Sequence, residues 1–286
     1  MVLLFLTSSE MPDLLPYDQE TIKSLTQQGI DVDILDWEKV IHTDSAILRN
    51  YKAIIIRTIW NYFKKPESFI EMLDFCEENN LPLLNPVNIV RWNMDKRYLQ
   101  DLQDDGIELI PTKFIFKHHE NVFQKAINRG WKTMVLKPMI SGGSYHTFVI
   151  TDQEGKRFDE LIEEFYQNRP YLLQEFIPEI ANGEISTLYF ANGYSYSIKK
   201  VPQAGDYRVQ FNYGGQYHVC PVDPQIQAIA QIIQERLNST TLYQRVDGVW
   251  RDGHFLLMEV ELIEPDLYLG HHEEALNEWV KNLMLL

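Results

Sequence analysis

Two apolar runs near the C-terminus carry three carboxylates, which restricts how this part of the chain can fold. The first run contains Asp247, the second contains Glu259 and Glu261, and Asp252–Gly253 lies between the runs. An Asp-Gly pair between apolar runs predicts a β-hairpin, in which residues two apart share a face. A two-residue loop would place Asp247 opposite Met258, whereas a three-residue loop would place it opposite Glu259.

Carboxylates inside apolar strands are costly to bury unless a cation meets them. Residues facing each other across such strands lie about 4.5–5.5 Å apart at Cα. Mg²⁺ prefers a few carboxylates together with substrate phosphates. The hairpin is therefore a candidate platform for Mg²⁺ and a nucleotide. A half-buried hairpin with one solvated acidic face is the competing interpretation, and apolar neighbours such as Val246 and Val260 argue against it.

The composition limits the classes of partner and the compartment. The chain has 286 residues, a formal net charge of −15 and a pI near 4.9. Nucleic-acid backbones need a basic footprint, so this charge disfavours a nucleic-acid partner. Cys76 and Cys220 lie outside any CxxC pair, so we expect neither a disulfide framework nor a zinc site, and a cytoplasmic location fits. The segment Met1–Leu6 lacks a basic stretch and is expected to be a core strand rather than a signal peptide. No apolar run approaches the ~18 residues of a membrane span.

Strand-like and helix-like segments alternate in the first 90 or so residues. The expected strands are Val2–Leu6, Val32–Leu35, Ala53–Arg57 and Leu81–Leu84, and the expected helices are Tyr17–Gln28 and Pro66–Asn79. Such alternation predicts a parallel sheet covered by helices. No GxGxxG follows the first strand, which disfavours NAD binding.

From Asn93 onward the pattern changes to α+β and mostly antiparallel. The expected helices are Asp95–Gln103, His119–Gly130, Phe158–Tyr166, Gln225–Leu237 and Glu273–Leu283. The expected strands before the acidic hairpin are Pro111–Phe116, Met134–Lys137, Thr147–Ile150, Tyr171–Phe176, Ile185–Ala191 and Tyr194–Lys199. The pair Asn192–Gly193 predicts a type I′ turn between the last two strands.

Lys137 ends an apolar strand just before the loop Ser141–Ser144. A lysine there reaches phosphate, and the glycines of the loop let backbone N–H groups approach it. GxxxxGK[ST] is absent, so this is not a Walker P-loop. A surface lysine beside a flexible loop is the alternative, and Lys96 by itself is typical of a solvated helix face.

Three further segments have polar groups at strand ends or in loops. Gln174–Ile177 ends a strand and has backbone groups suited to a purine ring, and Glu184 starts a strand where a carboxylate could hold ribose hydroxyls. The loop 205–215 carries Arg208, whose rigid guanidinium suits carboxylates and phosphates. Each of these segments taken alone is equally typical of an ordinary strand end or polar loop.

Taken in order, these motifs resemble those of the ATP-grasp ligases. The order is a helix lysine, a strand lysine with a Gly-rich loop, Gln-Glu-Phe-Ile, Gly-Glu, Gly-Asp-Tyr-Arg and finally Arg-Val-Asp with Glu-Val-Glu. The chain resembles most the branch with prokaryotic glutathione synthetase, the ribosomal-protein glutamate ligase and the cyclo-ligase of cycloserine biosynthesis; Asn85–Pro86, Trp92–Lys96 and Glu261–Pro265 contribute to the likeness. The resemblance implies an α/β N-terminal pre-ATP-grasp domain with a parallel sheet (1–90). An α+β ATP-grasp fold of two subdomains follows (91–286), with a lid at 111–173 and a catalytic part at 174–286.

The resemblance also implies how ATP and Mg²⁺ are held. According to this resemblance, Lys96 and Lys137 contact the ATP phosphates, and a mobile loop of Ser141, Gly142, Gly143 and Ser144 lies over them. The adenine hinge is presented by Glu175, Phe176 and Ile177, and Glu184 contacts the ribose. Two Mg²⁺ ions are bound by Asp247, Glu259 and Glu261. Many of these ligases carry Asn at the last metal position. Glu261 adds a negative charge there.

The reaction implied is activation of a small carboxylate, an amino acid or a peptide-like acid, as an acyl phosphate, followed by attack from an amine or similar nucleophile. Arg208 and Asn212 would stabilise the transferred phosphate, and Arg245 would face the acceptor substrate. The segment Arg57–Tyr62 follows a core strand, at the edge where α/β sheets bind ligands, although a packed aromatic loop is equally consistent. A small-molecule kinase and a non-catalytic nucleotide sensor remain the alternative functions.

Overall fold

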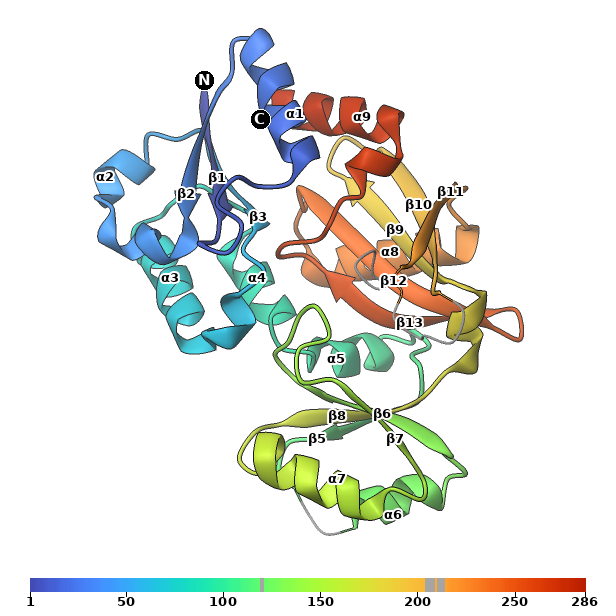
Figure 1. The fold of residues 1–286 in the computed structure, drawn as a ribbon. Helices are drawn as coiled ribbons and strands as arrows, with labels where there is room; N and C mark the ends of the chain where they lie inside the picture. Colours follow the sequence, from blue (N-terminus) through green and yellow to red (C-terminus); the bar gives the residue numbers. More distant parts are fainter. Residues whose placement is uncertain (119–120, 204–208, 210–213) are drawn as a thin grey trace.

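Three β-sheets organise the chain, and each is built from one stretch of the sequence (Figure 1). The structure is a computed structural model and describes residues 1–118, 121–203, 209 and 214–286. The first sheet is parallel and the other two are antiparallel. This arrangement confirms the predicted fold class, a parallel α/β region followed by an α+β fold in two parts.

The parallel sheet has the strand order β2-β1-β3-β4. Its strands are β1 (Val2–Thr7), β2 (Asp31–Asp36), β3 (Ala53–Thr58) and β4 (Leu83–Leu84). The helices of this region are α1 (Pro16–Gln27), η1 (Trp37–His42), α2 (Ser45–Leu48), η2 (Tyr62–Lys64), α3 (Pro66–Glu78), α4 (Val87–Asn93) and α5 (Tyr98–Asp104). Every residue of β3 is buried, as expected for a continuous apolar strand covered on both faces.

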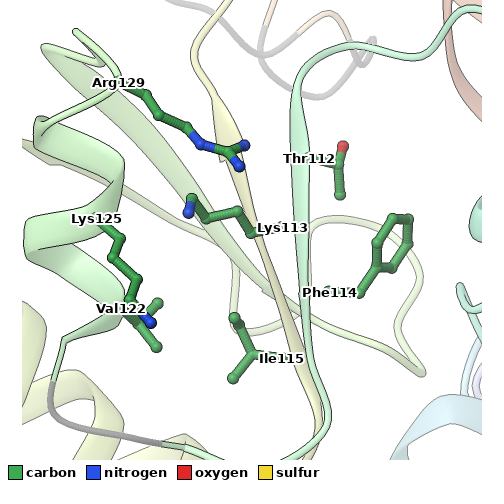
Figure 2. A pocket seen from close by; sticks show the side chains of 7 residues that line it. All are labelled: Thr112, Lys113, Phe114, Ile115, Val122, Lys125 and Arg129. Atoms are coloured by element: carbon green, nitrogen blue, oxygen red, sulfur yellow. The ribbon is translucent and has the colours of Figure 1, made fainter.

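The second sheet, called the middle sheet here, has the order β5-β8-β6-β7. Its strands are β5 (Thr112–Ile115), β6 (Thr133–Pro138), β7 (Phe148–Thr151) and β8 (Tyr171–Glu175), with the helices α6 (Val122–Ile127), α7 (Gly155–Leu161) and the π-helical turn η3 (Ile162–Tyr166). Both α6 and α7 lie on one side of this sheet, and α6 lies beside β5 (Figures 1 and 2). Burial alternates along β6, so Lys137 points away from the core residues Met134 and Leu136.

The third sheet has five strands in the order β11-β10-β9-β12-β13. Its strands are β9 (Glu184–Phe190), β10 (Ser195–Val201), β11 (Gln216–Cys220), β12 (Tyr243–Arg251) and β13 (His254–Glu261). The helices are η4 (Pro178–Asn182), α8 (Pro224–Leu237), η6 (Leu269–His271) and α9 (Glu273–Met284). One core joins this sheet to the parallel sheet, since Phe5 and Ile55 belong to the same buried cluster as Leu188 and Trp279.

The observed elements differ from the sequence expectations at four points. The helix expected from Asp95 begins only at Tyr98, because the Asp95 side chain accepts a hydrogen bond from the Arg97 N–H (3.0 Å) and holds a turn there. Helix α4 and strand β11 were not expected. Asn192 has no positive φ, and Phe190 N–H donates to the Tyr194 carbonyl, so the β9–β10 loop has three residues instead of a type I′ pair.

None of the helices in the described ranges is both long enough and apolar enough to cross a membrane.

Candidate active site

A β-bulge sets the register of the acidic hairpin, which is formed by β12 and β13. The turn has two residues, Asp252–Gly253, yet Asp247 lies opposite Glu259. The register shifts between Asp247 and Gly248, which leaves Met258 as an extra residue on β13. The expectation that a two-residue loop would place Asp247 opposite Met258 is therefore wrong, because the bulge moves the pairing by one residue.

Gly248 makes this bulge possible because there is no room for a side chain. A Cβ atom on it would lie 2.4 Å from the carbonyl oxygen of Leu256 and 2.5 Å from Cζ of Phe255. The first of these contacts is with backbone, so no side-chain rotation relieves it. The resulting register places the three acids, Asp247, Glu259 and Glu261, on one face of the sheet.

Arg245 lies among these acids and donates hydrogen bonds to two of them. Its Nε lies 3.0 and 3.1 Å from the two carboxylate oxygens of Asp247, and Nη2 lies 2.9 Å from Oδ2. Nη2 also pairs with Glu261, Nη1 donates to the Asp266 carbonyl (3.1 Å), and the guanidinium lies 5.3 Å from the Tyr268 ring centre. The arginine therefore bonds to two of the three acids.

Burial and neighbouring charges move the pKa values of these two acids in opposite directions. Burial on its own would raise the pKa of Asp247, but the charges of Arg245 and Lys200, with hydrogen bonds from Arg245 and Ser186, together outweigh it, and the net pKa lies below the usual value. Burial raises the pKa of Glu261 to about 8, with a further contribution from the charges of Asp247 and Glu259. Glu261 therefore holds a proton at neutral pH unless another cation approaches.

The two lysines singled out in the sequence converge on Glu259. Lys96 Nζ lies 2.9 Å from Glu259 Oε1 and donates to the Ser141 carbonyl (2.7 Å). Lys96 lies in the turn before α5, rather than just inside a helix as expected. Despite burial, the charges of Lys96 and Lys137 lower the pKa of Glu259. Burial is also the main reason why the pKa of Lys137 falls to about 8.

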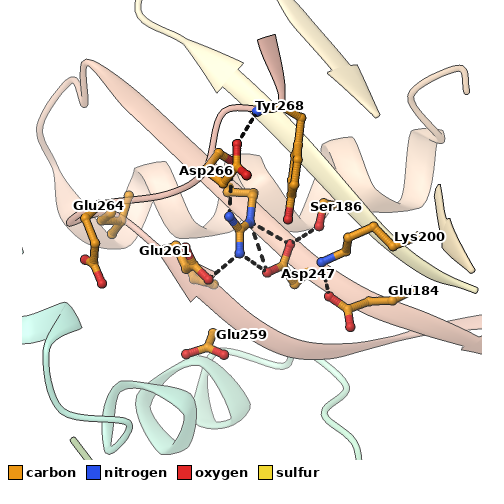
Figure 3. A network of polar contacts seen from close by, with 12 residues as sticks. Glu184, Ser186, Lys200, Asp247, Glu259, Glu261, Glu264, Asp266 and Tyr268 are labelled. Atoms are coloured by element: carbon orange, nitrogen blue, oxygen red, sulfur yellow. Dashed lines mark hydrogen bonds and ion pairs between the residues drawn. The ribbon is translucent and has the colours of Figure 1, made fainter. Parts of the chain in front are cut away.

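Glu184 is paired with a lysine that sequence reasoning missed. Lys200 on β10 lies opposite Glu184 on β9, and the two buried side chains form an ion pair. Ser186, two residues along β9, donates a hydrogen bond to Asp247 (2.5 Å), so this network continues into the hairpin (Figure 3). A lysine pair at positions 199–200 inside a strand was the available signal, because one of two adjacent strand residues must face inward.

The loop Ser141–Ser144 meets the N-terminal region. A Cβ on Gly142 would lie 2.8 Å from Cε1 of Phe63, and the Phe63 and Tyr145 rings lie 5.3 Å apart. Ser141 is buried, and its carbonyl receives the Lys96 bond. The first half of this loop is thus packed, whereas the resemblance implied a mobile loop.

The segment Glu175–Ile177 joins the middle sheet to η4 and the five-stranded sheet. Glu175 lies 3.1 Å from Arg251, at the tip of the acidic hairpin, and Ile177 is buried. The Phe176 N–H donates to the Thr133 carbonyl (3.0 Å), which leaves that N–H engaged within the sheet. A contact between this segment and an adenine ring stays a prediction.

The segment Arg57–Tyr62 is mostly internal. Arg57 is fully buried and its Nε pairs with Asp18 at 2.8 Å, so it does not face a substrate. Trp60 is partly exposed, and its Nε1 donates to the Glu264 carbonyl (2.9 Å), next to the acids. Two further predicted site residues, Arg208 and Asn212, lie outside the described residues.

The donor set suits Mg²⁺ chemically. Within the described ranges, no three His, Cys, Asp or Glu side chains converge closely enough to hold a metal ion by themselves. Mg²⁺ does not need this, because it is commonly held by one or two carboxylates together with substrate phosphates and water. Asp247 and Glu259 face each other on one sheet face, and the three acids here already attract cations. These residues therefore fit the ion.

Comparison with known proteins gives the same outline. Residues 98–249 match the family model for the ATP-grasp domain of prokaryotic glutathione synthetase, and residues 3–85 match that for the N-terminal domain of D-cycloserine synthetase DcsG. The cycloserine biosynthesis protein DcsG of Streptomyces lavendulae is 26% identical over 266 residues, which is 86% of each chain.

Solved structures show the same fold. The crystal structure of D-cycloserine synthetase DcsG superposes with a TM-score of 0.82 at 23% identity, over 99% of this chain and 98% of the other. The D-alanine–D-alanine ligase of Bacillus anthracis superposes with a TM-score of 0.67 at 16% identity, over 100% and 98% of the two chains.

Proposed function

The chain belongs to the ATP-grasp family of prokaryotic glutathione synthetase, and from this membership we propose that it activates a small carboxylate as an acyl phosphate. It is an ATP-dependent ligase that forms carbon–nitrogen bonds. In the proposed reaction, a carboxylate oxygen of the substrate attacks the γ-phosphorus of ATP and ADP leaves. An amine then attacks the acyl carbon, and inorganic phosphate leaves.

One observation carries this proposal: cations and acids from all three parts of the chain meet at one place. Lys96 comes from the turn before α5, Lys137 from the middle sheet, and the acids Asp247, Glu259 and Glu261 from the five-stranded sheet. Phosphoryl transfer needs mainly positioning and charge stabilisation, so such a convergence is what the chemistry requires.

We assign the nucleotide roles as follows, in keeping with the geometry. The two lysines hold phosphate oxygens, and the loop Ser141–Ser144 covers them. The segment Glu175–Ile177 meets the adenine, and Glu184, steadied by Lys200, meets the ribose. The boundaries at residues 90, 111 and 174 separate the N-terminal domain, the lid and the catalytic part in this proposal.

Mg²⁺ would be held by Asp247, Glu259 and Glu261, and when bound it neutralises phosphate charge. Arg245 keeps Asp247 ionised and oriented, since it bonds both oxygens of that carboxylate. A metal cation near Glu261, the second partner of Arg245, would lower the pKa of that carboxyl and favour its ionised form. We further propose that Arg245 then faces the acceptor substrate, while Arg208 and Asn212 stabilise the transferred phosphate.

The substrates are proposed to be an amino acid or peptide-like carboxylate and an amine or similar nucleophile. Trp60 and the acids around Glu264 border the place where such molecules would bind. An amino acid carries a positive ammonium group, which matches the acidic character of this region.

Trapping with hydroxylamine tests the reaction. With amino acids supplied as carboxylates, we expect ATP to be converted to ADP and phosphate, and hydroxylamine to yield a hydroxamate. Formation of AMP and pyrophosphate would contradict an acyl phosphate. A stable phosphate ester, with no joined product, would instead identify a kinase.

The charge state of Lys137 predicts a pH dependence of nucleotide binding. Its pKa of about 8 means that the ammonium group is charged at neutral pH and becomes neutral as the pH rises through 8. We expect the affinity for a nonhydrolysable ATP analogue to fall about tenfold or more between pH 7 and pH 9.5, since one charge-assisted hydrogen bond is lost. Lys137→Met should show that loss at every pH, roughly 1.5–3 kcal/mol.

Lys137→Arg is the informative companion, because a guanidinium stays charged throughout this range and should remove the part of the pH dependence that Lys137 causes, leaving only that of Glu261. Lys132→Met, an exposed lysine just before β6, is the matched control and should bind like the wild type. Titration calorimetry at both pH values measures the constants. A wild-type affinity that stays flat across the range would refute the phosphate contact.

A further inference from the structure

A groove of about 310 Å³ lies on the outer side of the middle sheet, between β5 and α6 (Figure 2). All four residues of β5, Thr112–Ile115, line it on one side, and Val122, Lys125 and Arg129 line it on the other. None of these residues belongs to the proposed active site.

β5 is an edge strand, and its outer side is free of any described strand. The Glu175 N–H donates to the Pro111 carbonyl (2.9 Å), so the backbone of position 111 faces β8. Such bonding alternates along an antiparallel strand, so the backbone N–H and C=O groups of Lys113 and Ile115 also point towards β8. The N–H and C=O groups of Thr112 and Phe114 consequently point outward into the groove.

Three cations surround this edge. Lys113 extends from β5 towards α6, and Arg129 extends from the end of the helix towards the strand, with Lys125 further along the helix (Figure 2). Among the described residues, no carboxylate forms an ion pair with any of the three. Burial, followed by the charges of Arg129 and Lys125, lowers the pKa of Lys113. In a chain with a net charge of −15, this is an uncompensated positive site.

The two faces of β5 differ, which defines the side chains that fit beside it. Ile115 packs with Val122 in the core under the sheet, so Lys113 lies on the helix side. Phe114 lies on the opposite face, and Phe116, which follows the strand, is 51% exposed. An added strand would thus meet cations on one face and aromatic rings on the other.

We propose that this groove binds an extended acidic segment of a partner polypeptide, which adds a strand to the free edge of β5. The backbone groups of Thr112 and Phe114 hold the segment by hydrogen bonds, as in other proteins that bind peptides by strand addition. Its carboxylates meet Lys113, Lys125 and Arg129, and its alternate residues, which are apolar, lie beside Phe114 and Phe116. This site is separate from the ligase chemistry and does not depend on it.

A fluorescently labelled peptide, acetyl-Thr-Glu-Val-Glu-Val-Glu-Thr-amide, tests the proposal by anisotropy titration with the full-length protein. We expect saturable binding that weakens at least tenfold in Lys125→Gln/Arg129→Gln. Lys156→Gln/Arg157→Gln on α7 removes the same charge from the same subdomain and should leave the affinity unchanged. Binding of a nonhydrolysable ATP analogue by each variant reports that the fold is intact.

Two further peptides are titrated against the wild-type protein only. A version with Lys in place of each Glu should not bind, and a version with alternate amides N-methylated should bind at least tenfold more weakly, because it cannot donate to the strand edge. Equal binding of the Lys peptide, or of the double variant, would overturn the site and leave the cations as protection against edge pairing. Equal binding of the N-methylated peptide would overturn strand addition. If millimolar inorganic phosphate displaces the acidic peptide at low peptide occupancy, the groove is a small-anion site instead.

Discussion

Asp247→Asn and Glu259→Gln are each expected to reduce Mg²⁺-dependent turnover by roughly 10²-fold or more, the size seen when one preorganised electrostatic group is removed from an active site. Both changes keep the shape of the side chain and remove its negative charge. Asp247 would lose its charge beside Arg245, and Glu259 would lose its charge beside Lys96. Release of ADP as a function of Mg²⁺ concentration measures the effect.

Asp252→Asn provides the matched control on the same hairpin. Asp252 is exposed at the turn with φ of 52°, a conformation that Asn also tolerates. We expect wild-type turnover from it. If Glu259→Gln keeps the full Mg²⁺ dependence, the hairpin is a structural element and the metal lies elsewhere.

Gly248→Ala is expected to destabilise the protein by about 2 kcal/mol or more, as overpacking of a close-packed site does. The new Cβ would lie 2.4 Å from the Leu256 carbonyl oxygen, so β12 and β13 must separate or lose the bulge. Either change disturbs the pairing of Asp247 with Glu259, and turnover should fall together with stability. Urea unfolding followed by fluorescence measures the shift in midpoint.

Gly270→Ala is the control for this substitution. The nearest atom to a Cβ there is Tyr17 Cδ1 at 3.4 Å, an ordinary contact, and the φ angle of Gly270 is not positive. Its stability should stay within about 0.5 kcal/mol of the wild type, as surface substitutions usually do. A Gly248→Ala protein with wild-type stability and turnover would show that the bulge does not depend on the missing side chain.

The acidic hairpin shows which structural features local sequence patterns predict and which they leave open. The Asp-Gly turn and the two-residue spacing of Glu259 and Glu261 predict the hairpin and the face that the two glutamates share. The partner of Asp247 was left open, because loop length alone does not reveal a bulge. The register depends on a contact between Gly248 and the facing strand, which the sequence does not display.

The ion pairs of the site are features that local sequence patterns do not predict. Lys96 meets Glu259, 163 positions further along the chain, and Lys200 meets Glu184 across a strand pair. Lys96 was expected as a solvated helix residue or, by resemblance, as a phosphate contact, and Lys200 was not singled out at all. Each pair forms because two separate segments of the chain come together in the fold, and no local sequence pattern encodes that contact.

Local sequence patterns predict the alternation of strands and helices, the parallel and antiparallel classes of sheet, the acidic hairpin and the resemblance to the ATP-grasp ligases, which the match to the family model confirms. These properties depend on periodicity and on short motifs, which act over a few residues. The tertiary structure alone decided which cation neutralises which acid, that Arg57 is internal, and that a basic groove lies at the edge of β5. They depend on burial and on long-range pairing, because the free energy of a charge is set by what surrounds it in space.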